Sequence, residues 1–144
     1  MSELTLRELT EKVNAQERQI KESDMTFKAI FCINPIPMCL ATIPDGTLVL
    51  CNDAFLEATG WEEKEAVGKT MLELGIYDKP EDRELLLKEA REKGFVKNLH
   101  LIFRNRFGNR FHSVFSAKML TIHEQSHFLA ITIVDFERRV RDRE

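Results

Sequence analysis

Apolar positions change their spacing along the chain, and this change predicts a long helix followed by a mixed domain. From residue 3 to about residue 22, apolar side chains recur at alternating steps of three and four, the spacing of a heptad seam. The seven seam positions, five of them apolar, are Leu6, Leu9, Val13, Gln16, Ile20, Ser23 and Phe27. Lys12 and Glu17 then occupy g and e positions, which meet when two helices pair in parallel. We expect an amphipathic, coiled-coil-like helix that pairs with a second copy or folds back onto its own domain.

No proline or glycine stops this helix before Pro35, and Asn34-Pro35-Ile36-Pro37 should break it, because each proline removes an amide donor and restricts the residue before it. Beyond this break, shorter apolar runs separated by turn residues predict strands and short helices. Strands are expected at residues 38–43, 47–51, 95–105, 109–120 and 127–136. Short helical segments are expected after Asn52, at 62–67 and, helical or irregular, at 71–77. The longest helix of the domain should begin near Pro80 and end before Gly94.

The densest local signal lies between residues 45 and 68. Asp45-Gly46 is a strong hairpin-turn signal, because glycine tolerates the positive φ of tight turns. Asn52 stands where a helix N-cap belongs, and Gly60 where the helix should stop. The segment therefore predicts a turn, a strand, a cap and a short helix in close succession.

This order of elements resembles the start of a PAS domain, a sensory and dimerisation module of signalling proteins such as sensor histidine kinases. The matching residues are Asp45, Gly46, Asn52, Ala54, Phe55, Gly60, Trp61 and Gly68. The resemblance covers about residues 24–138 and implies an α+β fold, with a five-stranded antiparallel sheet and helices on one face. We expect a dimerisation helix at 1–23, a PAS domain at 24–136 and the start of an output linker at 137–144.

The end of the domain is similar to the Asp-x-Thr-x-Arg junction of the family, which leads into an output helix. Asp135 and Arg138 match it, whereas Glu137 stands where threonine is usual. In the third hairpin, Phe107 replaces the aspartate that often precedes the turn glycine. The resemblance thus extends to both ends of the domain with two departures.

The resemblance implies a ligand site between the inner face of the sheet and the helices. It places Cys51 inward, and the alternation of side chains along a strand extends the set. The pocket candidates are Leu40, Val49, Cys51, Phe55, Thr59, Leu101, Phe103, Phe111, Ser113 and Ile131. They are almost wholly apolar, which suits either a small apolar guest or a filled core without a ligand.

The same alternation gives the outer face of the sheet an apolar patch that needs a cover, because half-exposed antiparallel sheets usually carry polar residues there. The N-terminal helix, its own or that of a partner, is the expected cover. The dimer-interface candidates are Leu6, Leu9, Val13, Ile20, Ile102, Val114 and Phe128. A homodimer is therefore the expected state, with a downstream signalling domain or protein as the further partner.

Charge and cysteine content bear on the expected partners, localisation and metal binding of the protein. A net charge of −3 gives no reason to expect nucleic acid as a partner, and no apolar run is long enough to predict a membrane segment. Cys32, Cys39 and Cys51 match no metal-ligand spacing and favour reduced thiols in a cytoplasmic protein.

Candidate chemistry is sparse. No paired titratable groups predict catalysis, so the chain is not expected to be an enzyme, and any catalytic activity would belong to a separate domain. The photoactive flavin branch of the family carries a cysteine where this chain has Gly75-Ile76-Tyr77-Asp78. None of the four histidines falls on the long helix of the domain, the element from which haem would be expected to be bound. No cofactor or metal is therefore expected. A haem, flavin or metabolite sensor and a purely structural module remain alternatives.

Overall fold

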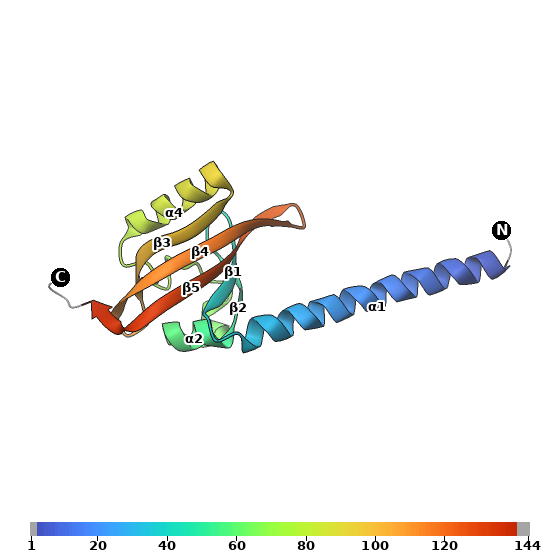
Figure 1. The fold of residues 1–144 in the computed structure, drawn as a ribbon, viewed down its shortest axis with the longest axis horizontal. Helices are drawn as coiled ribbons and strands as arrows, with labels where there is room; N and C mark the ends of the chain where they lie inside the picture. Colours follow the sequence, from blue (N-terminus) through green and yellow to red (C-terminus); the bar gives the residue numbers. More distant parts are fainter. Residues whose placement is uncertain (1–2, 141–144) are drawn as a thin grey trace. The chain divides into compact units, whose positions relative to one another are not determined.

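The computed structural model describes residues 3–140 and divides the chain into two units, Met1–Ile33 and Asn34–Glu144. The first unit is helix α1, Glu3–Ile33, shown in blue in Figure 1. Its 31 residues span ~46 Å at the usual rise per residue. The helix continues past residue 22, where the heptad segment was expected to end, and stops directly before Asn34-Pro35, the expected helix break. The unit boundary accordingly falls after Ile33 rather than after residue 23.

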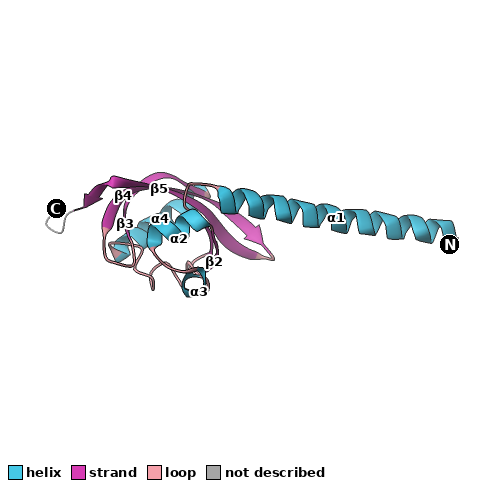
Figure 2. Ribbon diagram, turned by 90° about the horizontal axis from the view of Figure 1, so that it is seen from below, coloured by secondary structure: helices cyan, strands magenta, loops and turns pink. Residues whose placement is uncertain are grey.

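The second unit is built on a five-stranded antiparallel sheet in the order β2-β1-β5-β4-β3. The strands are β1 Met38–Thr42, β2 Leu48–Cys51, β3 Phe95–Arg104, β4 Arg110–Ile122 and β5 Gln125–Val140. The helices are α2 Asp53–Thr59, α3 Glu63–Ala66 and α4 Pro80–Lys93. Figure 2 shows them on one side of the sheet, which confirms the expected α+β architecture. We call the side toward these helices the inner face and the opposite side the outer face.

Local signals at the helix ends act as the sequence indicates. The side-chain oxygen of Asn52 accepts a hydrogen bond from Phe55 N, which caps α2, and Gly60 ends that helix with φ 78°. Pro80 is the first residue of α4, and Gly94 ends it with φ 77°. Residues 71–77, expected to be helical or irregular, form turns without a helix. The caps therefore fix where α2 and α4 begin and end.

The faces of β1 and β5 are the reverse of the prediction. Cys39 pairs with Ala130 and Ala41 with Phe128, while Ala130 also pairs with Ala117 of β4. These residues share the inner face, so the inward placement of Leu40 and Ile131 and the outward placement of Phe128 are wrong. Both strands are apolar on both faces, so alternation in the sequence does not identify the inner one, and a slip of one residue exchanges the faces.

Two β-bulges change the alternation further. Val49 is an extra residue of β2, since Leu50 pairs with Leu40 and Leu48 with Ala41. Its side chain is 38% exposed, which contradicts the inward placement that alternation gave it. The pairing of β3 shifts between Val96 and Leu99, where Asn98 has φ 52°.

Strand β5 continues past the expected end of the domain. Residues 137–140, predicted to begin an output linker, extend the strand to Val140, which pairs with Arg110. The register shifts near Asp135, whose Oδ1 accepts hydrogen bonds from the amides of Glu137 and Arg138. Residues 141–144 lie outside the described part of the chain. The Asp135 junction thus forms a bulge within a strand.

Loops occupy hydrogen-bonding groups on both edge strands. At β2, Leu48 N donates to Lys69 O and Gly68 N donates to Leu48 O, both at 2.9 Å. At β3, Arg104 N donates to Ile76 O at 2.9 Å and Asp78 N donates to Ile102 O at 3.4 Å. These two loops therefore extend the sheet on either side.

Candidate functional site

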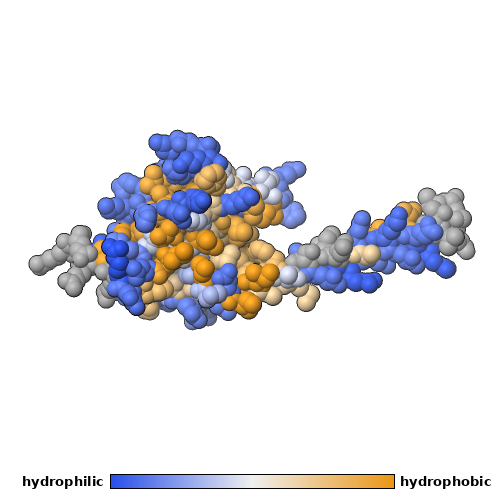
Figure 3. Space-filling model, in the orientation of Figure 1, coloured by the Kyte–Doolittle hydropathy of each residue, from blue (hydrophilic) through white to orange (hydrophobic). Residues whose placement is uncertain are grey.

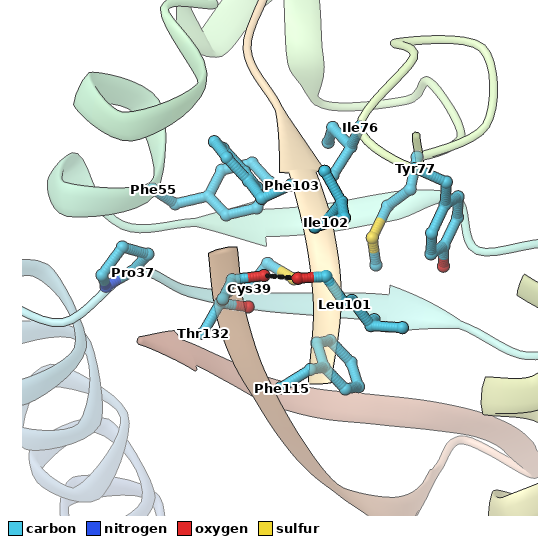
Figure 4. Close-up of a pocket in the computed structure, with 12 residues that line it drawn as sticks. Pro37, Cys39, Phe55, Ile76, Tyr77, Leu101, Ile102, Phe103, Phe115 and Thr132 are labelled. Atoms are coloured by element: carbon cyan, nitrogen blue, oxygen red, sulfur yellow. Dashed lines mark hydrogen bonds between the residues drawn. The ribbon is translucent and has the colours of Figure 1, made fainter. Parts of the chain in front are cut away.

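A small cavity lies between the inner face of the sheet, α2 and the loop before α4. Its volume is about 30 Å³. The residues around it are Pro37, Cys39, Phe55, Met71, Ile76, Tyr77, Leu101, Ile102, Phe103, Ser113, Phe115 and Thr132. They come from β1, β3, β4 and β5, from α2, from the segment before α4 and, for Pro37, from the chain that enters β1. Figure 4 shows how the labelled side chains surround the cavity. The site is therefore assembled from segments far apart in the sequence.

Four of the predicted pocket residues border this cavity: Phe55, Leu101, Phe103 and Ser113. The six other pocket candidates do not. Cys51 and Phe111 are half-buried and pack against the same core. Thr59 is fully buried on α2, where its hydroxyl donates to Leu56 O at 3.3 Å.

The remaining three pocket candidates, Leu40, Val49 and Ile131, lie away from the cavity. Leu40 and Ile131 are on the outer face, and Val49 is in the bulge of the edge strand. Their misplacement follows from the strand register described above. That the pocket candidates contact a ligand stays a prediction.

Sequence reasoning missed several residues that line the cavity. Cys39 and Thr132 neighbour Leu40 and Ile131 along their strands, so placing Leu40 and Ile131 inward put them on the opposite face, which the pairing of β1 and β5 corrects. Met71, Ile76 and Tyr77 come from a segment without strand or helix, so no periodicity marks them. The isolated bridge between Tyr77 and Phe103 brings this segment to the sheet.

The polar groups around the cavity are neutral and partly satisfied. Ser113 Oγ donates to Leu101 O at 2.9 Å, the dashed bond in Figure 4. Burial raises the pKa of the Cys39 thiol and of the Tyr77 hydroxyl well above their ordinary values, so both are protonated at neutral pH. The cavity therefore offers a neutral, mostly apolar surface.

The volume of the cavity limits the size of the ligand that it can bind. Binding sites for drug-sized ligands usually measure about 300–1,000 Å³, whereas a cavity for one water needs about 10–15 Å³. With Phe55 and Phe103 packed as they are, the cavity is large enough for water and too small for a drug-sized ligand. A haem- or flavin-sized guest would require these side chains to move. No group of three His, Cys, Asp or Glu side chains in the described residues is arranged to hold a metal ion.

Asn52 connects α2 to the chain that enters β1. Its Oδ1 accepts hydrogen bonds from Phe55 N and Met38 N, both at 2.9 Å. Its Nδ2 donates to Ile36 O at 2.9 Å and to Asn34 O at 3.4 Å. Since Asn52 is fully buried, these bonds satisfy a side chain that would otherwise be costly to bury. They hold Pro37 and Phe55, on two sides of the cavity, in fixed relation.

Asp78 fixes the loop that closes the cavity at Tyr77. Its carboxylate oxygens lie 3.3 Å from Arg104 Nη2 and 3.5 Å from Arg110 Nη1. The Asp78 side chain is 9% exposed, whereas those of Arg104 and Arg110 are 42% and 16% exposed, so the carboxylate is buried and the contact with Arg104 is partly open to water. The two arginines come from β3 and β4, and the contact therefore ties the loop to both strands.

A family model and similar solved structures both support the fold. The family model described as PAS domain matches residues 35–136. No curated protein matches the chain significantly. Among solved structures, the PAS domain of an HTR-like protein from Haloarcula marismortui has a TM-score of 0.65 and 21% identity, covering 85% of this chain and 99% of its own.

Two further structures show the range of proteins that share the fold. A PAS domain from a two-component sensor histidine kinase has a TM-score of 0.68 and 15% identity, covering 80% of this chain and 99% of its own. The PAS domain of the fruit-fly ELK potassium channel has a TM-score of 0.61 and 22% identity, with coverage of 76% and 94%. Since the family model spans most of the chain, this protein belongs to the PAS domain family.

Proposed function

We propose that this chain is a sensory and dimerisation module of a cytoplasmic signal-transduction protein, such as a sensor histidine kinase, and that it passes on a signal by rearranging two subunits. Any catalysis would belong to a separate domain. The observation that carries the proposal is the apolar outer face of the sheet. No helix among the described residues is long and apolar enough to cross a bilayer.

The outer face gathers apolar side chains from all the strands. By strand pairing they are Met38, Leu40, Leu50, Ile102, Val114, Leu129, Ile131 and Ile133. Most are half-buried, and Ile133 is 57% exposed. Figure 3 shows hydrophobic residues clustered on this side of the domain. An apolar sheet face of this kind favours an interaction surface, because solvated sheet faces usually carry polar residues.

Of the predicted interface residues in the domain, two retain their place in this proposal. Val114 and Ile102 belong to the outer face, although Ile102 also borders the cavity. Phe128 is excluded, since it is 3% exposed and packs in the core of the inner face. The two faces of the sheet therefore have separate roles in the proposal.

Helix α1 supplies a second surface for the same partner. Leu6, Leu9 and Val13 are 60%, 47% and 52% exposed, while the side chain of Ile20 lies outside the described residues. The seam continues at Phe27 and then at Ile30, which is 58% exposed. A helix with an unpaired heptad seam favours pairing with a second copy of itself.

The signal would act on the balance between two arrangements of the dimer, which an input can shift only by binding one arrangement better than the other. The cavity is the candidate input site, and α1 and the end of β5 are the candidate outputs. Sedimentation equilibrium of the full chain tests the dimer. We expect the mass of two chains at micromolar concentration, and a monomer at high concentration would contradict the proposal.

A structural interaction module without a ligand is the second candidate, and the small cavity favours it. A sensor of a haem, a flavin or a metabolite is the alternative in which Phe55 and Phe103 move aside. Native mass spectrometry with an absorption scan separates the two. Dimer mass alone would favour the structural module, and extra mass per chain or a visible band would favour the ligand sensor.

A further inference from the structure

Two of the three cysteines face each other across neighbouring strands. Cys39 of β1 and Cys51 of β2 are direct pairing partners. The hydrogen bond from Asn52 N to Met38 O, at 3.1 Å, joins the residues that flank them. Cys39 and Cys51 therefore occupy a non-hydrogen-bonded position of the antiparallel ladder, where side chains approach most closely. Both are free thiols.

The spacing at such a position suits a disulfide. Cα atoms of non-hydrogen-bonded pairs lie about 4.5 Å apart, within the roughly 4.4–6.8 Å range of disulfide-linked cysteines. Directly opposed residues also point to the same face of the sheet, so Cys51 shares the inner face with Cys39. A bond between the two sulfurs thus requires side-chain rotation and no change of register.

The surroundings hold the pair in register and expose its two members unequally. The hydrogen bonds that Asn52 Oδ1 accepts from Met38 N and Phe55 N fix both chains at one end of the pair, and the pairing of Leu40 with Leu50 fixes the other end. Cys39 is 3% exposed, whereas Cys51 is half-buried. A reagent from solution therefore reaches Cys51 first, and Cys39 is placed to react with the product.

We propose that Cys39 and Cys51 form a cross-strand dithiol that is oxidised to a disulfide by exchange with a small disulfide such as oxidised glutathione. The sulfur of Cys51 attacks one sulfur of glutathione disulfide, and the first glutathione leaves as a thiol with the proton from Cys51. The sulfur of Cys39 then attacks the Cys51 sulfur, and the second glutathione leaves with the proton from Cys39. Two protein thiols and one small disulfide thus give one protein disulfide and two glutathione thiols.

Oxidation would affect both the sheet edge and the cavity. β2 is an edge strand that pairs with β1 alone among the strands, and the disulfide would join it covalently to its partner. Cys39 also borders the cavity, so the bond would change one wall of the candidate input site. This redox-sensitive site stands whether or not the cavity takes a ligand.

The same burial makes exchange slow at neutral pH. Burial, and next the charge of Glu63, raise the pKa of Cys51 to about 12. Burial, and next Cys51, raise the pKa of Cys39, and the charge of Cys39 in turn contributes to the raised pKa of Tyr77. Since the thiolate is the nucleophile, we expect the rate of the first exchange to rise about tenfold per pH unit between pH 7 and 9.

The test uses the full chain with Cys32→Ser, which removes the exposed third thiol on α1 and leaves the pair intact. The reduced protein is equilibrated with mixtures of reduced and oxidised glutathione and mapped by peptide mass spectrometry. We expect a peptide pair joined through Cys39 and Cys51, with a loss of two hydrogens from the intact mass. In the same background, Cys39→Ala should instead retain glutathione on Cys51.

Repeating the equilibration in denaturing urea shows whether the fold favours the bond. We expect the equilibrium constant for the intramolecular disulfide to be roughly 10- to 100-fold higher in the folded protein. The oxidised protein should also melt about 5–10 °C above the reduced one. A stable mixed disulfide on Cys51 in the Cys32→Ser protein, or an equilibrium constant no higher in the folded state, would overturn the proposal.

Discussion

The two faces of the sheet carry similar apolar side chains but have different environments. On the inner face, Phe103, Phe115 and Phe128 are each no more than 5% exposed under the helices and the loop before α4. On the outer face, Ile133 is 57% exposed and its neighbours are mostly half-buried. Apolar composition therefore marks both a core and a candidate interface, and only the burial of individual residues separates them.

This difference gives the two faces different expected responses to substitution. Residues of the inner face should contribute to the free energy of unfolding of a single chain. Residues of the outer face should contribute to association and little to folding. The following variants test that division, from the largest expected effect to the smallest.

Phe55→Ala should lower the free energy of unfolding by about 3–5 kcal/mol, because it leaves a cavity where a buried ring packed against the sheet. Urea unfolding monitored by circular dichroism measures the change. Phe107→Ala is the matched control, since that ring is 75% exposed and its loss should cost about 0.5 kcal/mol or less. Equal losses for the two variants would contradict the assignment of Phe55 to the core.

Asn52→Ala should destabilise the domain by about 2–4 kcal/mol, because it removes the cap of α2 at the buried Phe55 amide and leaves the part-buried main-chain groups of Met38 and Ile36 without their partner. The measurement is again urea unfolding. The control is Asn34→Ala, whose half-buried side chain accepts one hydrogen bond, from Ile36 N. A cost for Asn52→Ala as small as that for Asn34→Ala would mean that the buried network contributes little.

Ile133→Glu should weaken the dimer at least about tenfold, since it places a charge within an apolar interface. Its exposed position should keep the change in unfolding free energy within about 0.5 kcal/mol when folding of the monomer is measured. Analytical ultracentrifugation over a concentration series gives the dissociation constant. Leu72→Glu, at a 47% exposed position away from the sheet, is the control. Unchanged association for Ile133→Glu would rule out the outer face as the interface.

Asp45, in the turn outside both faces, should have the smallest effect. Hydrogen bonds from the hydroxyls of Thr42, at 2.6 Å, and Thr47, at 2.8 Å, lower the pKa of its carboxyl. A lowered pKa in the folded state gives stability that is present above the unfolded pKa of about 3.9 and is lost as the pH falls through the folded value. Thermal melts should show the advantage of the native chain over Asp45→Ala shrinking below about pH 4. An advantage that grows on acidification would contradict this.

The sequence was sufficient to predict which helices and strands form and in what order. It was not sufficient to predict which face of β1 and β5 points toward the helices. The ends of α2 and α4 could be predicted because they depend on local residues, namely Asn52, Gly60, Pro80 and Gly94. Such local effects do not depend on how distant strands pair. The faces of β1 and β5 depend on pairing with distant strands, and both strands are apolar on both sides. Alternation along β1 and β5 therefore could not show which side chains face the helices.

Prediction of the residues that line the cavity was incomplete for a related reason. Phe55, Leu101, Phe103 and Ser113 were found because α2 and the β3–β4 hairpin keep simple local patterns. Cys39 and Thr132 were missed through strand register, and Tyr77 through the absence of any periodic pattern in its loop. The residues that close a site from irregular segments are those for which a single sequence carries the least information.

The loops beside the two edge strands have a consequence for how copies of this chain can meet. An edge with free amide and carbonyl groups invites a strand from another molecule, which leads to open-ended assembly. Here Lys69 and Gly68 occupy groups of Leu48 at one edge, and Ile76 and Asp78 occupy groups of β3 at the other. The bulges at Val49 and Asn98 further disturb both edges. Strand addition at these groups is thereby disfavoured, which argues against open-ended assembly through the occupied parts of the two edges.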